Sequence, residues 1–251
     1  MTKRPVALIT GASRKIGIGA SIARTLAGAG WDIGITWWQP YDRSMPWGSS
    51  PRETDELVLE LEDLGAAVFA MEADLSQIGS PSQVIRHTAE TLGNVSALIL
   101  SHCHSVDSTI VSTTVESFDL HFAVNARASW LLIREFGSQF TGGYGTGRIL
   151  AITSDHVAGN LPYGASKGAM DRIVLAAAEE YREMGITANV INPGATDTGW
   201  MDDGLKTRVR DATFLDRIGR PEDCAHLVEF LCSPRGGWIN GQVLYSNGGV
   251  E

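Results

Sequence analysis

The sequence predicts a single α/β domain in which helices cover both faces of a parallel sheet, the doubly wound arrangement. Short, nearly continuous apolar runs alternate with longer segments of helical periodicity along the whole chain of 251 residues. A glycine-rich turn directly follows the first apolar run and directly precedes the first helical segment. No linker composition divides the chain and no segment is repeated. We therefore expect one domain over residues 1–251, with a sheet of about seven strands.

The expected strands do not alternate between apolar and polar residues, which indicates burial on both faces of the sheet. They are 5–10, 31–36, 67–72, 97–100, 148–153, 187–191 and 242–246. The helix near residue 82 opens with "SPSQ" and the one near 221 with "PEDC", both favourable first-turn compositions. The expected helices are 20–29, 53–64, 82–92, 116–140, 163–184 and 221–232.

The loops that follow the strands are the ones to examine for function, because doubly wound sheets bind ligands beyond the carboxyl ends of their strands. Two of these loops are long: 37–52 is rich in Trp and Pro, and 193–220 is rich in charge. The glycine-rich "GGYGTG" at 142–147 precedes a strand. We therefore expect it to be a surface turn and not a phosphate site.

Composition excludes some partners. The net charge of -9 argues against nucleic acids and anionic membranes, which attract basic proteins. No apolar run approaches the roughly 20 residues of a membrane span. Cys103, Cys224 and Cys232 form no C-x-x-C pair, and no signal peptide opens the chain. We expect a soluble cytoplasmic protein with reduced thiols.

The stretch "TGASRKIGIG" at residues 10–19 has its glycines at Gly11, Gly17 and Gly19. Its place between the first strand and the first helix is that of a dinucleotide-binding turn. There a tight turn brings the backbone close to phosphate, and a helix N-terminus faces the anion. A plain glycine-rich turn is the alternative, and the position in the fold favours the nucleotide.

The second strand ends near Thr36 without the carboxylate that would accept a hydrogen bond from a ribose 2′-hydroxyl. Arg14 and Lys15 lie in the glycine turn, where a cation can pair with a 2′-phosphate. We therefore expect NADP(H) to be favoured over NAD(H). Asp42 or Arg43, further along the loop, could alter that choice.

The motif "YGASK" places Tyr163 and Lys167 four residues apart, on one face of the longest helix. A neighbouring ammonium and a positive nicotinamide ring would both lower the pKa of a tyrosine from its usual value of about 10. The phenol could then donate a proton to a carbonyl oxygen while hydride reaches the carbon. The alternative is a surface pair of little energetic value.

Ser154 ends a strand and could hydrogen-bond a substrate oxygen there, or simply cap the strand. Asn125 lies midway along 116–140. Asn is a weak helix former, so it could open the helix locally and bind a water that relays protons to Lys167. An ordinary polar helix residue is the alternative for Asn125.

Together these motifs resemble the short-chain dehydrogenase/reductase superfamily, in its shorter single-domain branch, along nearly the whole chain. The matching pieces are "TGASRKIGIG", "ADL" at 73–75, "VN" at 124–125, Ser154, "YGASK", "NPGATDT" at 192–198 and "GQVLYSNGG" at 241–249.

The resemblance implies a Rossmann-like fold and a tetrad of Asn125, Ser154, Tyr163 and Lys167. Tyr163 would be the general acid–base, Lys167 would hold the nicotinamide ribose, Ser154 would position substrate and Asn125 would anchor a relay water. Family members are usually tetramers, so we expect a homotetramer or homodimer paired partly through the helices that carry Asn125 and Tyr163. Cofactor contacts are expected from Gly11, Ser13, Arg14, Lys15, Gly17, Ile18, Asp74, Leu75, Asn125, Tyr163, Lys167, Pro193, Gly194, Thr196 and Thr198.

Three features depart from the family pattern. The glycine turn is two residues longer, and "SHCH" at 101–104 stands where the family has N-N-A-G. Ser154 and Tyr163 are only nine residues apart, about four fewer than usual, which leaves Thr153 as a minor alternative. His102 and His104 suggest a metal, but two histidines without a third ligand are not a typical zinc spacing. We expect no metal, and a hydrogen-bonding role at the strand end.

The sequence thus predicts an oxidoreductase that transfers hydride between NADP(H) and a ketone or secondary alcohol. Proteins with these motifs are often labelled 3-oxoacyl-carrier-protein reductases, which reflects the fold more than the substrate. The expected substrate walls are the loop 155–162, including His156, and 199–217, with Trp200, Met201 and Phe214. The segment 193–220 is expected to close as a lid. A non-catalytic dinucleotide sensor is the alternative, and a dehydratase or epimerase is less favoured.

Overall fold

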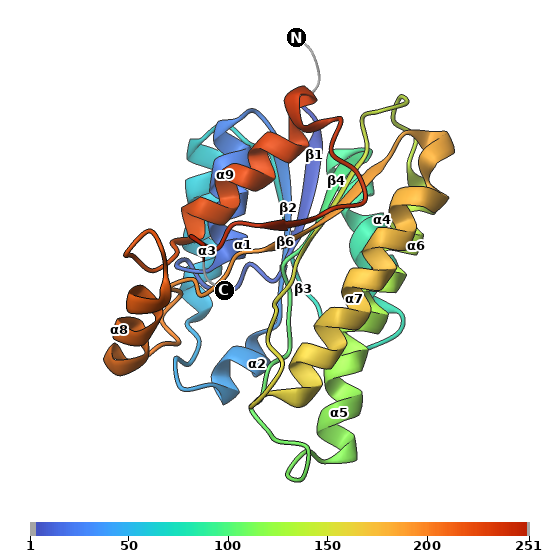
Figure 1. The fold of residues 1–251 in the computed structure, drawn as a ribbon. Helices are drawn as coiled ribbons and strands as arrows, with labels where there is room; N and C mark the ends of the chain where they lie inside the picture. Colours follow the sequence, from blue (N-terminus) through green and yellow to red (C-terminus); the bar gives the residue numbers. More distant parts are fainter. Residues whose placement is uncertain (1–3, 250–251) are drawn as a thin grey trace.

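The computed structural model describes residues 4–249 (Figure 1). Within these residues, seven parallel strands form one sheet in the order β3-β2-β1-β4-β5-β6-β7. The order runs outward in both directions from β1 and β4, which confirms the predicted doubly wound, Rossmann-like fold. The strands are β1 (Val6–Thr10), β2 (Asp32–Trp37), β3 (Val68–Glu72), β4 (Val95–Leu100), β5 (Arg148–Ile152), β6 (Thr187–Asn192) and β7 (Val243–Tyr245).

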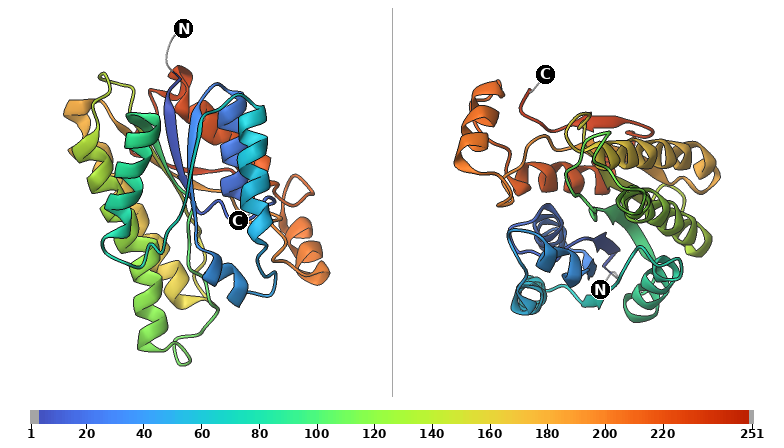
Figure 2. Two further views of the ribbon diagram at one scale, coloured as in Figure 1. Left: turned by 180° about the vertical axis from the view of Figure 1, so that it is seen from behind. Right: turned by 90° about the horizontal axis from the view of Figure 1, so that it is seen from below.

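Helices cover both faces of the sheet, as the two turned views show (Figure 2). Residues of α1, α3 and α9 share a hydrophobic cluster on one face, and residues of α4, α6 and α7 share another on the opposite face. These helices are α1 (Ile18–Gly28), α3 (Pro51–Asp63), α9 (Pro221–Cys232), α4 (Ser80–Leu92), α6 (Ala128–Gln139) and α7 (Leu161–Glu180).

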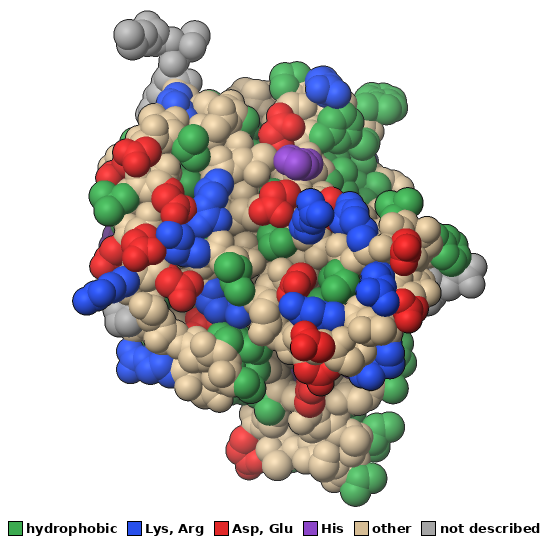
Figure 3. Space-filling model, turned by 90° about the vertical axis from the view of Figure 1, so that its left-hand side faces the viewer, with side chains coloured by type: hydrophobic (Ala, Val, Ile, Leu, Met, Phe, Trp, Pro, Cys, Tyr) green, Lys and Arg blue, Asp and Glu red, His purple; other side chains and the backbone are tan. Residues whose placement is uncertain are grey.

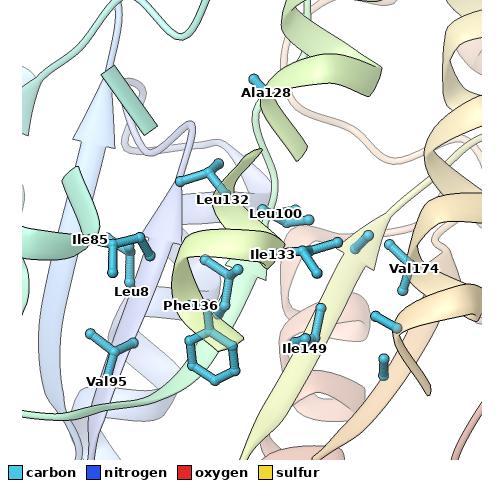
Figure 4. Packing of buried hydrophobic residues seen from close by; sticks show 14 of the residues in the cluster. Leu8, Ile85, Val95, Leu100, Ala128, Leu132, Ile133, Phe136, Ile149 and Val174 are labelled. Carbon is cyan, nitrogen blue, oxygen red and sulfur yellow. The ribbon is translucent and has the colours of Figure 1, made fainter. Parts of the chain in front are cut away.

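The residues of β1 divide between the two clusters. Val6 and Leu8 belong to the α4–α6–α7 side, whereas Ala7 and Ile9 belong to the α1–α3–α9 side. On the first side, Leu8 lies in one cluster with Ile85, Leu132 and Phe136 (Figure 4). Each fully buried Leu, Ile or Phe contributes about 1.5–3 kcal/mol. Burial on both faces explains why β1 reads as an unbroken apolar run. The edge strands β3 and β7 have no fully buried residue, so the expected burial on both faces does not extend to them.

The single helix expected over 116–140 consists of three consecutive pieces. They are α5 (Val115–His121), a π-helix η1 (Phe122–Arg127) and α6. Asn125 lies within the π-helix, so the expected local opening of the helix at this residue is confirmed. A π-helix turns residues out of α-helical register and is frequent at functional sites.

Each of the two long loops contains a short helix that was not predicted. α2 (Gln39–Ser44) lies in the first and α8 (Asp203–Ala212) in the second. The Asp202 side chain accepts a hydrogen bond of 2.7 Å from the Leu205 amide and so caps α8. An aspartate before a helical segment is a known start signal, but the charged composition of 193–220 obscured it.

Acidic and basic side chains are interspersed on the face that bears α3 and α8 (Figure 3). Several of them form ion pairs, such as Lys15 with Glu60 and Arg217 with Asp223. The "GGYGTG" segment is a largely exposed turn between α6 and β5, as predicted. In residues 4–249 no helix is both long enough and apolar enough to span a bilayer.

Candidate active site

The glycine turn depends on glycine at two positions. Gly11 has φ of +76°, and a Cβ there would lie 2.6 Å from the His102 Cα. A Cβ on Gly19 would lie 2.6 Å from the Gly11 carbonyl oxygen. Gly17 is the N-cap of α1, with no capping side chain and no acidic residue in the first turn. The first amide groups of α1 therefore form a potential anion site, which fits a dinucleotide phosphate.

Arg14 and Lys15 differ in their partners. Lys15 forms ion pairs of 2.9 Å with Glu56 and 2.6 Å with Glu60 on α3, and these raise the pKa of its ammonium, the hydrogen bond with Glu60 contributing most. The Arg14 guanidinium lies 4.5 Å from the centre of the Trp47 ring, and its Nε is 4.0 Å from Asp42. Of the two predicted phosphate-binding cations, Arg14 is thus the less firmly paired.

The segment 39–48 connects the ends of β2 and β4. Tyr41 donates a hydrogen bond of 3.2 Å to the Ser105 carbonyl, beyond β4. Trp47 donates from its indole nitrogen to Asp42 at 3.1 Å, and Asp42 is buried. With Trp47 stacked on Arg14, this segment lies beside the glycine turn, where Figure 1 shows α2 below the carboxyl ends of the strands.

His102 is buried and joins three segments. Its Nδ1 lies 2.6 Å from the Thr10 hydroxyl and its Nε2 lies 3.0 Å from the Val124 carbonyl. Because a carbonyl can only accept, Nε2 carries the proton and Nδ1 accepts from Thr10. Burial lowers the pKa of His102 to about 3. The predicted hydrogen-bonding role at the strand end is confirmed, and residues 4–249 contain no group of three or more potential His, Cys, Asp or Glu metal ligands.

Asn125 is fully buried and holds the backbone after β4. Its Oδ1 accepts from the His104 amide at 2.7 Å, and its Nδ2 donates to the His104 carbonyl at 2.9 Å. Nδ2 also donates to the Ser166 hydroxyl at 2.9 Å. The side-chain amide of Asn125 therefore holds the strand-end loop against α7.

Tyr163 and Lys167 lie in the first two turns of α7, which begins at Leu161 with Pro162 in the first turn. The Lys167 Nζ lies 5.9 Å from the centre of the Tyr163 ring and donates to the Ile152 carbonyl at 2.8 Å. Burial raises the pKa of Tyr163, and a hydrogen bond with Ser154 acts in the opposite direction. Burial lowers the pKa of Lys167.

The protein alone therefore does not lower the pKa of Tyr163, contrary to the expectation from the sequence. Desolvation of the phenol outweighs the hydrogen bond with Ser154, and the Lys167 Nζ donates to the Ile152 carbonyl instead of to the phenol. The nicotinamide charge would have to supply the remaining stabilisation of phenolate.

The short loop between β5 and α7 still brings Ser154 to Tyr163. The Ser154 Oγ accepts a hydrogen bond of 3.1 Å from the His156 amide. Thr153, the minor alternative, is buried and lies beside Asp171. The His156 side chain is exposed, with its ring centre 6.4 Å from that of Tyr163.

A cavity of about 260 Å³ lies beyond the ends of β5, β6 and β7. Among the predicted wall residues, Met201 is buried and Trp200 donates from its indole nitrogen to the Thr196 carbonyl. Neither lines this cavity, and neither does His156. The lining residues are Asp155, Gly194, Ala195, Arg208, Val209, Ala212 and Asn247.

The predicted wall segment 199–217 contains the α8 residues of this lining, but Arg208, Val209 and Ala212 were not singled out within it. Arg208, Val209 and Ala212 share one face of α8, so the spacing i, i+1, i+4 was the available signal. It can be read only once a helix is recognised there, and Asp202 is the residue that reveals the helix.

The remaining predicted cofactor residues lie at the same edge of the sheet. The Asp74 carboxylate accepts from the Ser76 amide at 2.9 Å, and Leu75 is buried. Gly194 has φ of +61°, and Thr196 donates to the Pro193 carbonyl at 3.3 Å. Thr198 is buried, whereas Ser13 and Ile18 are half-buried in the glycine turn.

A doubly wound sheet with a glycine turn, and with tyrosine, lysine and serine at its carboxyl edge, defines a dinucleotide-dependent oxidoreductase. The family model described as enoyl-(acyl carrier protein) reductase matches residues 11–251. The chain belongs to the short-chain dehydrogenase/reductase superfamily, and it is an NAD(P)-dependent enzyme.

Known proteins resemble it over almost their whole length. An uncharacterized oxidoreductase, YjdA, of Bacillus subtilis is 35% identical, covering 99% of this chain and 97% of its own. An NADPH-dependent aldehyde reductase-like chloroplastic protein of Arabidopsis thaliana is 32% identical, covering 97% and 93%. The crystal structure of a short-chain dehydrogenase from Burkholderia cenocepacia in complex with NADP has a TM-score of 0.88 at 30% identity, covering 99% of each chain.

Proposed function

We propose that this enzyme reduces a ketone to a secondary alcohol with NADP(H), and that Tyr163 is the general acid–base. The observation that carries the proposal is the buried tyrosine next to both Ser154 and Lys167 at the carboxyl edge of the sheet. The names of the Arabidopsis and Burkholderia proteins support NADP(H) and a carbonyl substrate. An aldehyde is a second candidate substrate, because the name of the Arabidopsis protein includes an aldehyde reductase activity.

The chain's own residues supply binding, orientation and the proton. Bound nicotinamide would supply hydride. The Tyr163 hydroxyl donates its proton to the carbonyl oxygen, and Ser154, already within hydrogen-bonding reach of Tyr163, holds that oxygen as negative charge develops on it. Lys167 is fixed by the Ile152 carbonyl, so its charge stays beside Tyr163 in either direction of the reaction.

Asn125 acts in this proposal as a positioning residue. Its hydrogen bonds to the His104 amide and carbonyl set the loop after β4, and its bond to Ser166 sets the turn of α7 between Tyr163 and Lys167. A relay water near Lys167, as the family resemblance implies, would complete the path by which Tyr163 recovers its proton.

The proposed preference for NADP(H) rests on Arg14. A guanidinium can pair with the 2′-phosphate in a bidentate geometry, and Arg14 already stacks on Trp47 beside the glycine turn. Lys15 is held by Glu56 and Glu60, so we assign it a smaller part. Asp42, the carboxylate nearest to Arg14, would compete with the 2′-phosphate and limit the preference.

The direct test is the rate of NADPH and NADH oxidation at 340 nm with a panel of ketones and aldehydes. We expect turnover of at least one ketone and a higher kcat/KM with NADPH than with NADH. Equal efficiency with the two cofactors would contradict the Arg14 assignment. If no carbonyl compound in the panel were reduced with either cofactor, the proposed reaction would be wrong.

We also infer a homodimer or homotetramer. Large apolar side chains are exposed along the helices before and after Asn125, including Val115, Leu120 and Trp130. Exposed large apolar side chains on these helices favour a protein–protein contact there. Light scattering in solution should give a mass two or four times 27.0 kDa, and a monomer mass would contradict the inference.

A further inference from the structure

The cavity beyond β5, β6 and β7 has walls of unequal charge. The loop after β5 contributes Asp155, and α8 contributes Arg208 together with the apolar side chains of Val209 and Ala212. Asp155 follows Ser154 directly, and its charge helps to raise the pKa of Tyr163, so it marks the end of the cavity near the proposed acid–base. Arg208 belongs to the other wall.

Arg208 differs from the other cations of α8. Lys206 pairs with Asp197 at 2.9 Å, and Arg210 pairs with Asp211 at 3.0 Å. Among the described residues, no carboxylate oxygen lies within 4.0 Å of a guanidinium nitrogen of Arg208, so Arg208 forms no ion pair there. Asp202 lies six residues before Arg208, at the N-cap of α8, and its carboxylate caps the helix by accepting from the Leu205 amide. The cavity-lining cation is therefore available to a ligand.

We propose that the substrate is a small carbonyl compound that carries a carboxylate, and that Arg208 binds this carboxylate. The inference rests on the proposed function and names the substrate class of the same site. A guanidinium binds a carboxylate through two parallel hydrogen bonds, which fixes both distance and orientation. Asp155 repels an anion from the Tyr163 end, so the neutral carbonyl group enters there.

The dimensions of the cavity agree with this assignment. Its volume of about 260 Å³ is below the roughly 300–1,000 Å³ of sites for drug-sized ligands. Val209, Ala212 and Ala195 provide the apolar surface for the carbon skeleton between the two polar ends. A small oxo acid or a carboxylated aromatic aldehyde has this sequence of polar, apolar and anionic groups.

The test compares two substrates that differ only in this charge, 4-formylbenzoate and its methyl ester, at saturating NADPH. In the wild type we expect a higher kcat/KM for the carboxylate. In Arg208→Gln the ratio of kcat/KM for carboxylate over ester should fall at least tenfold, mainly through KM for the carboxylate. Arg208→Lys should retain part of the ratio, and Arg210→Gln, also on α8 but outside the cavity, should leave it unchanged.

Asp155→Asn removes a negative charge from the cavity, whereas Arg208→Gln removes a positive one. Without the negative charge of Asp155, the substrate carboxylate should no longer be kept away from the Tyr163 end of the cavity. KM for 4-formylbenzoate should therefore fall, without a matching change in KM for the methyl ester. Equal losses on both substrates in Arg208→Gln would mean that Arg208 acts on lid closure or folding, and would overturn the assignment. An unchanged ratio would overturn it as well.

The two levels of the proposal fail in different ways. If the wild type reduces the ester and its ratio does not depend on Arg208, the substrate class is wrong while the reductase function stands. If the wild type reduces neither these aldehydes nor any ketone of the panel, the proposed function is wrong, and the substrate class falls with it.

Discussion

Arg14 and Lys15 are neighbours in the glycine turn, yet the fold gives them different surroundings. The Lys15 ammonium is shared by two glutamates of α3, whereas the Arg14 guanidinium faces the Trp47 ring. Sequence alone could place both residues in the turn, because the turn is local. It could not distinguish their roles, because the partners come from residues 47, 56 and 60.

We expect Arg14→Gln to lower kcat/KM for NADPH by about 10- to 100-fold and to leave that for NADH within about threefold, since a charge-assisted bidentate contact is lost. Lys15→Gln should have a much smaller effect on both, because its charge is already neutralised. Steady-state kinetics with each cofactor measures this. A larger effect of Lys15→Gln than of Arg14→Gln would reverse the assignment.

His102 should make the fold sensitive to acid. Its pKa is lowered to about 3 in the folded protein, against 6.5 for the ordinary group, so the unfolded chain binds its proton first as the pH falls. Its stabilising contribution is complete above pH 6.5 and is lost progressively as the pH falls towards 3. Between pH 7 and pH 4 this amounts to as much as about 3 kcal/mol of unfolding free energy.

Urea unfolding of wild type and His102→Asn at the two pH values should show a smaller loss of stability in the variant. Asn is neutral throughout this range. The exposed His226 serves as the control, and His226→Asn should keep the wild-type dependence. The same dependence on pH in all three proteins would show that His102 does not titrate as proposed.

At the scale of elements, the glycine turn and the strand-end loop support each other. Gly11 passes so close to the His102 backbone that a Cβ would lie 2.6 Å from its Cα, and the loop after β4 is in turn held by Asn125. One packed unit is therefore formed by the glycine turn, the π-helix η1 and the loop 101–104. A substitution in the glycine turn should alter the structure on the nicotinamide side of the site.

We expect Gly11→Ala to lose about 2 kcal/mol or more of stability together with cofactor binding, because both the positive φ and the close contact oppose a side chain. Gly28→Ala is a matched control, since no heavy atom lies within 4 Å of its added Cβ. Alanine there should be neutral or stabilising by up to about 1 kcal/mol. Urea unfolding and NADPH titration would measure both effects, and a stable Gly11→Ala that bound NADPH normally would refute the proposed coupling.

Most of the elements could be predicted from local patterns. The strands are mostly apolar, and α9 was predicted to its observed bounds. α2 and α8 could not be recognised by hydrophobic periodicity, since α2 is six residues long and α8 has no buried residue. For the same reason the predicted wall segment 199–217 was correct as a range, but Arg208 was not identified within it, because it lines the cavity from α8.

At the scale of the whole molecule, the sheet order brings together residues that are far apart in sequence. Ser154 and Tyr163 follow β5, Gly194 follows β6, Asn247 follows β7, and the glycine turn follows β1. Their proximity follows from the parallel topology, so the sequence could predict that these residues share one edge. The tyrosine pKa could not be predicted in this way, because burial by the assembled fold dominates it.

The central claim is that Tyr163 donates the proton in a NADPH-dependent carbonyl reduction. We expect Tyr163→Phe to lower kcat/KM for the accepted carbonyl by about 10²–10⁴-fold, the range for removal of a general acid. NADPH affinity and unfolding free energy should stay near those of the wild type. Tyr144→Phe, at a tyrosine that is 80% exposed, should retain full activity. Wild-type turnover by Tyr163→Phe would contradict the account.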